Sequence, residues 1–172
     1  QALHRMVVPI PGEDATAFLA RFATTGGVVE ELFEDVQHVA SGQARINPRG
    51  SVMLTSTHDE IRGGRAGLSS EGCRFPADDR YRLAIQEQTV RVAEVLATCG
   101  LVSRVSVGFM VLPAPPPDEE AGFRLVASEV NLGVGGSTHP LLAVRFLCEG
   151  ALDPATGLFV TLTRRSKHYR AT

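Results

Sequence analysis

Apolar and polar residues alternate along the middle of the chain, and this alternation predicts β-strands. In the segment SVMLTST, residues 51–57, the pattern has a period of two, which predicts one buried and one polar face. The turn sequence NPRG lies just before it, so the segment 38–60 is expected to form two strands joined by a hairpin. Further strands are predicted at residues 4–10, 27–35, 103–112 and 123–132.

Three stretches have the pattern of helices. Residues 81–100 are the clearest, because apolar residues such as Leu83 and Val90 recur near helical spacing. Residues 11–27 and 139–150 are the other two, the latter with a proline in its first turn, where proline is tolerated.

The segments between these elements are expected to be irregular. Residues 61–79 are rich in glycine and predict a long loop, and the residues after 150 predict a turn and a weak strand. The mixed order of hairpins and helices predicts an α+β fold, with a mixed or antiparallel sheet and flanking helices, and not a doubly wound sheet.

The composition is that of a globular protein. The chain has 172 residues, of which 44% are hydrophobic and 21% charged, with a formal net charge of −2. There is no basic stripe and no apolar run of the roughly 18–20 residues that cross a bilayer, so we expect neither a nucleic-acid nor a membrane partner. The three cysteines are far apart and form no CxxC pair, which argues against a zinc site and a disulfide framework and favours the cytoplasm.

Glu129 and Asn131 are the first candidates for chemistry. They stand two residues apart near the end of a predicted strand, so their side chains share one face. A carboxylate and an amide oxygen suit a hard cation such as Mg²⁺ in the presence of phosphate. The simpler interpretation, an acid and an amide that only end a strand, stays open. The turn GVGG at residues 133–136 would admit a phosphate or a substrate, although glycines most often only make turns.

Several other polar residues have two interpretations each. Glu30 and Glu31 form either a solvated edge or a hinge that contacts adenine and ribose. His58 and Asp59 point to opposite faces of a strand and so do not easily bind one metal ion. His139 either caps a helix or contacts a substrate carboxylate, and a lone histidine is more often structural. Three arginines of the glycine-rich loop either clamp phosphate or form a solvated rim, namely Arg62, Arg65 and Arg74.

Several motifs occur together in one order and spacing, namely GGVVEELFED, INPRG, STHDEIRGG, GCRFPAD, SRVSVGF, SEVNLGVGGSTHPLLAVRFL and KHYRAT. In this combination they resemble the C-terminal part of an ATP-grasp ligase, in particular the peptide ligases related to the pheganomycin enzyme. The resemblance implies that residues 1–37 are a remnant of the ATP-grasp lid and hinge and that residues 38–172 form the C-terminal lobe. The chain begins at Gln1 and stops just after a strand-like segment, so we expect it to be a piece of a longer protein.

The resemblance also implies an activity. ATP would lie between two lobes, its γ-phosphate would move to an amino-acid or peptide carboxylate, and an amine would displace phosphate from the acyl phosphate. Such chemistry requires charge neutralisation at the phosphates, for which the cofactors ATP and Mg²⁺ are expected together. The formation of a homo-oligomer is left open.

The family's functional residues correspond to particular positions of this chain. The magnesium ligands correspond to Glu129 and Asn131. The catalytic residues correspond to Arg104 and His139. The nucleotide-binding hinge corresponds to Glu30, Glu31, Leu32, Phe33 and Gln37. The substrate-binding residues correspond to His58, Arg74, Gly135, Gly136, Ser137 and Thr138.

The chain departs from the family at two charged positions. Gly108 stands where the family usually has a metal-binding aspartate, and Gly133 stands where it usually has a phosphate-binding arginine. The lid strands with the nucleotide-binding lysine are expected before residue 1, so we expect this chain alone to be inactive. Three hypotheses follow: a carboxylate–amine ligase present as a partial chain, a degenerate ATP-grasp domain that binds nucleotide, peptide or a partner, and a purely structural domain.

Overall fold

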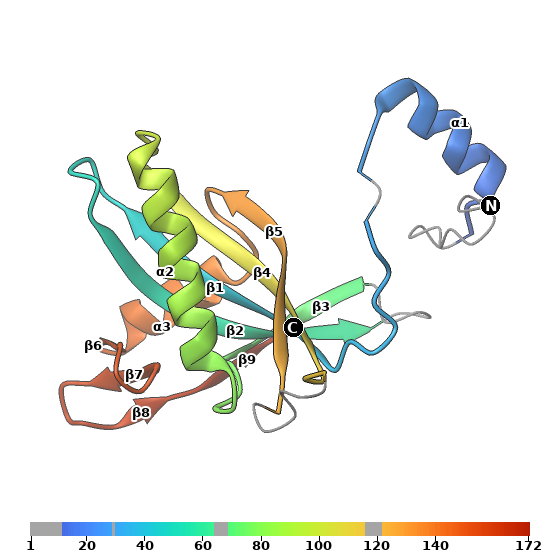
Figure 1. Ribbon diagram of the computed structural model, residues 1–172. Coiled ribbons are helices and arrows are strands. Elements are labelled where there is room, and N and C mark those ends of the chain that lie inside the picture. Colours follow the sequence, from blue (N-terminus) through green and yellow to red (C-terminus); the bar gives the residue numbers. More distant parts are fainter. Residues whose placement is uncertain (1–11, 29, 64–68, 116–121) are drawn as a thin grey trace.

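The structure of the protein is a computed structural model that describes residues 12–28, 30–63, 69–115 and 122–172. Its centre is a six-stranded sheet in the order β5-β4-β1-β2-β3-β9, in which every neighbouring pair is antiparallel (Figure 1). Its strands are β1 (His38–Ile46), β2 (Val52–Gly63), β3 (Ser69–Phe75), β4 (Arg104–Leu112), β5 (Arg124–Leu132) and β9 (Tyr169–Ala171). An antiparallel sheet with helices confirms the predicted α+β fold.

The helix α2 (Arg82–Thr98) covers one face of the main sheet (Figure 1). Alternate residues of β4, such as Val105 and Val107, are buried in the same cluster as Ile85 of this helix. The helix comes close to β1 because residue 42 is a glycine, and the side chain of Thr89 fills the space that a Cβ would need there. Successive residues of a strand point to opposite faces, so the remaining residues of these strands face away from α2 and can form a site.

The residues that follow β5 form a second, smaller layer, which packs against the main sheet. It contains α3 (Thr138–Leu147) and a three-stranded sheet of β6 (Gly150–Asp153), β7 (Leu158–Thr161) and β8 (Ser166–Lys167). Phe75 of β3, Leu141 of α3 and Phe159 of β7 form a buried cluster that joins this layer to the main sheet. The C-terminal strand β9 then pairs with β3, which brings the end of the chain back to the sheet.

The helix α1 (Ala15–Thr25) has little contact with the rest. The carboxylate of Asp14 caps it by accepting hydrogen bonds from the backbone N–H groups of Thr16 and Ala17, and no residue of the helix is buried. Figure 1 shows it away from the main sheet, joined to β1 by an extended segment. The expected boundary between residues 37 and 38 stays a prediction.

Most predicted elements are confirmed, and three are corrected. Residues 30–35 form no strand, because they lie before the first strand of the sheet and pair with none of it. The predicted loop 61–79 contains the end of β2 and the whole of β3, and the residues after 150 contain four short strands. These strands have weak local patterns. β3 pairs with the preceding β2 and with the distant β9, and β6 pairs with the following β7. The predicted strand 4–10 lies outside the described residues.

Among the helices that the structure describes, none combines the length and the apolar character needed to cross a membrane.

Candidate functional site

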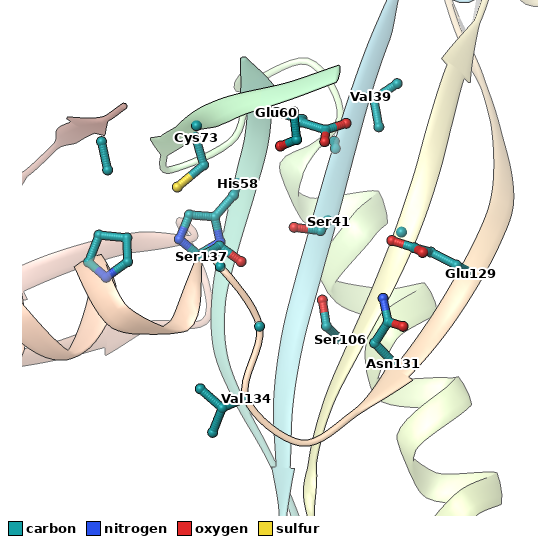
Figure 2. A pocket seen from close by; sticks show the side chains of 18 of the residues that line it. Val39, Ser41, His58, Glu60, Cys73, Ser106, Glu129, Asn131, Val134 and Ser137 are labelled. Atoms are coloured by element: carbon teal, nitrogen blue, oxygen red, sulfur yellow. The ribbon is translucent and has the colours of Figure 1, made fainter. Parts of the chain in front are cut away.

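The face of the main sheet opposite α2 carries an open cavity of about 700 Å³, which we call the main cavity (Figure 2). Its floor is formed by side chains of four neighbouring strands, and its rim by the turn after β5 and by the end of the chain. Polar residues line the floor, among them Ser41, His58, Glu60, Ser106, Glu129 and Asn131. These residues alternate along the strands with the apolar residues that pack under α2, which explains why the cavity face is polar.

One row of residues crosses the floor of the main cavity from strand to strand. Glu129 of β5 pairs with Gly108 of β4, Gly108 pairs with Ser41 of β1, and Ser41 pairs with His58 of β2. Directly paired residues of an antiparallel sheet point to the same face, so the carboxylate and the imidazole face one cavity from its two sides. The sheet register therefore joins two of the candidates that the sequence separates by 71 positions, the difference between 129 and 58.

Glu129 and Asn131 lie side by side on β5, as the strand period requires (Figure 2). Both are exposed and both line the main cavity. Their carboxylate and amide oxygens fit a Mg²⁺ ion whose other ligands are phosphate oxygens and water, because Mg²⁺ in such sites uses few protein ligands. In the described part of the chain, no three His, Cys, Asp or Glu side chains lie close enough to hold a metal ion by themselves.

Gly108 lies where a second carboxylate would stand. A Cβ built there would lie 2.7 Å from Cγ of Glu129, so the Glu129 side chain occupies the space of the absent residue. Gly133 follows β5 with a φ of 111°, which a residue with a side chain rarely adopts, and its N–H donates to the carbonyl of Arg104. The structure thus accommodates glycine at both positions where the resemblance leads us to expect a charge, through a side chain at Gly108 and through the backbone at Gly133.

The glycine-rich turn is held against the sheet by a buried amide. The side chain of Gln43, on β1, donates from its Nε2 to the hydroxyl of Ser137 and accepts from the hydroxyl of Thr138. Thr138 in turn accepts from the backbone N–H of Gly135. Gly135, Gly136 and Ser137 line the main cavity, whereas the buried side chain of Thr138 holds the turn from behind.

His58 is buried, with about 1% of its surface exposed. Its Nε2 lies 2.6 Å from the hydroxyl of Tyr169 on β9, and its ring packs near the rings of Phe75 and Tyr169. Burial lowers the pKa of His58 to about 3, so the imidazole is neutral at physiological pH. Its neighbour Asp59 points to the other face, where its carboxylate accepts a hydrogen bond from Tyr81, which confirms that the two residues face opposite sides.

Cys73 and Glu60 pair across β2 and β3 and line the same end of the main cavity (Figure 2). Burial raises the pKa of the Cys73 thiol, which keeps it protonated and makes it a poor nucleophile. Glu60 lies 3.8 Å from the guanidinium of Arg62, at the edge of the cavity. Among the described residues, this end of the cavity offers hydrogen-bonding groups and one carboxylate but no activated nucleophile.

Besides Thr138 and the residues of the expected hinge, three residues implied by the resemblance lie outside the lining of the main cavity as the structure describes it. Arg74 is exposed on β3 and pairs with Asp59 and Arg170 in the sheet, one residue out of phase with Cys73. Arg104 begins β4, on the same face as Ser106. His139 is exposed in the first turn of α3. Their roles stay predictions.

The residues of the expected nucleotide hinge lie beyond the other end of β4. Glu30, Glu31 and Leu32 are exposed, and the ring of Phe33 lies under the guanidinium of Arg124 at 5.6 Å. The backbone N–H of Gln37 donates to the carbonyl of Val111, and Gln37 lines a second cavity of about 240 Å³ together with Tyr81 and Phe123. On β1, the cavity-lining residues Val39 and Ser41 follow Gln37 closely, so the hinge adjoins the end of β1 at which the main cavity lies.

Sequence reasoning missed three residues of this site, Ser41, Gln43 and Tyr169. The alternation in HVASGQARI places Ser41 and Gln43 on one face of the first strand of the hairpin, and this signal could have found them. Tyr169 has no such signal, because the strand that carries it has three residues and is formed only by pairing with β3.

No family model matches this chain. Solved structures share its fold, among them a carboxylase and a synthetase. The biotin carboxylase of Campylobacter jejuni, in complex with β-γ-ATP, aligns with a TM-score of 0.54 and 13% identity, over 75% of this chain and 27% of that one. The N5-carboxyaminoimidazole synthetase of Staphylococcus aureus, complexed with ADP, aligns with a TM-score of 0.51 and 13% identity, over 76% of this chain and 32% of that one. The fold is that of part of an ATP-grasp protein.

Among ligases of this class, the chain resembles the L-propargylglycine–L-glutamate ligase of Streptantibioticus cattleyicolor. The two are 33% identical over 158 residues, which are 88% of this chain and 30% of the ligase. The resemblance to an ATP-grasp ligase that the motifs predict is thus confirmed. The chain spans less than a third of the length of this relative.

Proposed function

We propose that this chain is the C-terminal part of an ATP-dependent carboxylate–amine ligase that works through an acyl phosphate. The observation that carries the proposal is the row across the main cavity, with Glu129 at one side and His58 at the other. A phosphate-bound Mg²⁺ fits the first side, and the glycine-rich turn and His58 leave room for a carboxylate at the second. The identity with the relative supports this assignment.

The reaction would proceed in two displacements. An oxygen of the substrate carboxylate attacks the γ-phosphorus of ATP, and the bond to the β-γ bridging oxygen breaks to release ADP. The amine then attacks the acyl carbon, phosphate leaves, and the amine gives up a proton. When bound, Mg²⁺ neutralises charge on the transferred phosphoryl group. Glu129 and Asn131 would hold the Mg²⁺ ion, and the turn at Gly135 and Gly136 would let the substrate approach the backbone.

The substrates proposed are amino acids or short peptides. The name of the relative gives L-propargylglycine and L-glutamate, which between them offer an amine and a carboxylate. Because the chain matches 30% of that ligase, we propose that the residues needed for turnover are shared with other parts of the protein and that the chain alone is inactive. The free thiols of Cys73, Cys99 and Cys148 suit a reducing cytoplasm, where we place the protein.

The test is phosphate release by the full-length protein, whose intact mass is measured first. ATP, Mg²⁺, L-glutamate and L-propargylglycine are supplied together, and each is left out in turn. The proposal expects phosphate release that requires all four and a product whose mass is the sum of the two amino acids minus water. Phosphate release that no amino acid stimulates, in a panel of amino acids and dipeptides, would contradict it.

A second function, a degenerate ATP-grasp domain that binds nucleotide without turnover, is favoured by Gly108 and Gly133. Gly108→Asp would return a carboxylate to the metal site, provided that the Glu129 side chain moves from its present rotamer. The corresponding change Gly133→Arg would be strained, because the φ of 111° at this position disfavours side chains. Gly108→Asp alone is therefore the better experiment. Activity that appears only in this variant indicates a lapsed ligase, and activity already present in the wild type indicates that the glycines are tolerated.

A further inference from the structure

The contact between His58 and Tyr169 joins a residue of the main cavity to the C-terminal strand. The distance of 2.6 Å between His58 Nε2 and the tyrosine hydroxyl is that of a strong hydrogen bond. Both rings are held in place by aromatic packing, since the rings of Phe75 and Tyr169 stack with centroids 5.1 Å apart. The hydrogen bond to Tyr169 and the packing against Phe75 and Tyr169 therefore fix the orientation of the imidazole.

The second ring nitrogen of His58 has no such partner. Its Nδ1 is fully buried and forms no hydrogen bond with any described residue. His58 nevertheless lines the main cavity, where Figure 2 shows the ring between Cys73 and the turn at Ser137. A buried polar atom without a partner is costly, and in a residue that lines a cavity it is a candidate to receive its partner from a bound molecule.

The hydrogen-bond inventory distinguishes the two neutral forms of His58. If Nε2 carries the proton and donates to Tyr169, the tyrosine O–H and the Nδ1 lone pair are both left without a partner. If Tyr169 donates to Nε2, the proton is on Nδ1, and that single N–H is left for a ligand. The second arrangement leaves fewer groups unsatisfied. Burial raises the pKa of Tyr169 above its ordinary value, which keeps the hydroxyl protonated and able to donate.

We propose that Tyr169 is a positioning residue: its hydroxyl donates to Nε2 of His58 and fixes the proton on Nδ1, so that the neutral imidazole donates to a carboxylate oxygen of the substrate in the main cavity. This inference rests on the proposed function for the identity of the substrate. It adds that the C-terminal strand β9 takes part in substrate binding although Tyr169 itself does not line the main cavity. A neutral donor suits this place, because a buried charged imidazole would be strongly disfavoured.

The test uses the full-length protein labelled with ¹⁵N only at histidine, with the His58 signals assigned from the His58→Gln variant. The nitrogen shifts of a neutral imidazole differ between the protonated and the unprotonated nitrogen, so they report the tautomer directly. We expect the proton on Nδ1 in the wild type and a shift of the population toward Nε2 in Tyr169→Phe. The variant keeps the aromatic ring and its packing and removes only the hydroxyl.

Tyr81→Phe is the matched control. It also removes one tyrosine hydroxyl, but that hydroxyl donates to Asp59 on the other face of the sheet. It should leave the His58 nitrogen shifts unchanged. In the ligase assay, Tyr169→Phe should raise KM for L-glutamate about fivefold with kcat nearly unchanged, since one hydrogen bond to a bound carboxylate contributes about this factor to uniform binding.

The wild-type spectrum alone is decisive if Tyr169→Phe does not fold. A proton on Nε2 in the wild type, or the same tautomer in wild type and Tyr169→Phe, would overturn the inference. The proposed function fails by a different route, through the absence of amino-acid-dependent phosphate release. The tautomer is measured without substrate, so the two results are independent.

Discussion

The side-chain oxygen of Gln43 accepts a hydrogen bond of 3.2 Å from the hydroxyl of Thr138, across 95 positions of the chain. Both side chains are buried, and the same glutamine donates to Ser137. One amide of β1 therefore holds the turn that forms the rim of the main cavity. Because the backbone of this turn contains three glycines in four residues, at positions 133–136, it has few side chains of its own to hold it.

Gln43→Ala should loosen this turn. Two hydroxyls would lose their partner, and we expect a cost of about 1–3 kcal/mol in the free energy of unfolding. If the turn binds substrate, KM for the amino acid should rise more than KM for ATP. Steady-state kinetics and urea titration measure the two effects. Gln88→Ala on α2 is the control, and equal losses in both variants would count against a special role for Gln43.

Glu129→Gln should lower the rate of phosphate release without lowering the stability of the fold. The change keeps the shape of the side chain and removes the charge that we assign to Mg²⁺, so phosphate release should fall by about 10²–10³ and require more Mg²⁺. Glu129 is exposed, so stability should change little.

Glu87→Gln is the matched control, because Glu87 is exposed on α2, which covers the opposite face of the sheet. A magnesium titration of phosphate release compares the three proteins. An unchanged magnesium dependence in Glu129→Gln would remove this residue from the metal site.

The fold was predictable wherever a segment carries its own pattern. The hairpin of β1 and β2 has an alternation and a turn signal, and α2 has a helical period, so each was found from local residues. β3 and β9 were missed because SSEGCRF and YRA have little alternation of their own. β3 pairs with the preceding β2, and β9 forms a strand only by pairing with the distant β3.

The candidate site was predictable in part for a similar reason. Glu129 and Asn131 follow from a spacing of two on one strand, which a sequence displays directly. The row that joins Glu129 to His58 depends on the register of three strand pairs, which the sequence does not display. The residues between them, Gly108 and Ser41, are of types that do not by themselves indicate a functional site. Motif resemblance supplied His58, but only the structure relates it to Tyr169.

Gly42→Ala should weaken the contact between β1 and α2. An added Cβ would meet the Thr89 side chain and lie 3.1 Å from Cγ2 of Ile85, both in the core under the helix. Overpacking of this kind costs about 1–3 kcal/mol. Gly136→Ala is the control, since a Cβ there would meet no atom within 4 Å. Hydrogen exchange of the β1 amides should rise in the first variant alone, and similar exchange in both would show that the helix can shift to make room.

Stability should fall as the solution becomes acidic, because of His58. Its pKa is near 6.5 in an unfolded chain and about 3 in the folded protein, so between these values the unfolded chain binds a proton that the folded protein does not. The free energy of unfolding should therefore decrease by about 1.4 kcal/mol per pH unit below pH 6.5 from this group. Burial raises the pKa of Asp59, which offsets part of the loss near the pKa of ordinary carboxyl groups.

The range from pH 7 to pH 5 lies above the ordinary pKa of the carboxyl groups, and comparison with a His58 variant separates His58 from the other four histidines. Urea titrations followed by circular dichroism at several pH values in this range, for wild type and His58→Gln, measure the slope. The wild type should lose stability more steeply than the variant, whatever the stability of the variant at pH 7. Parallel slopes would mean that the imidazole is solvated in the folded protein, and that Tyr169 does not hold it in a buried, neutral form.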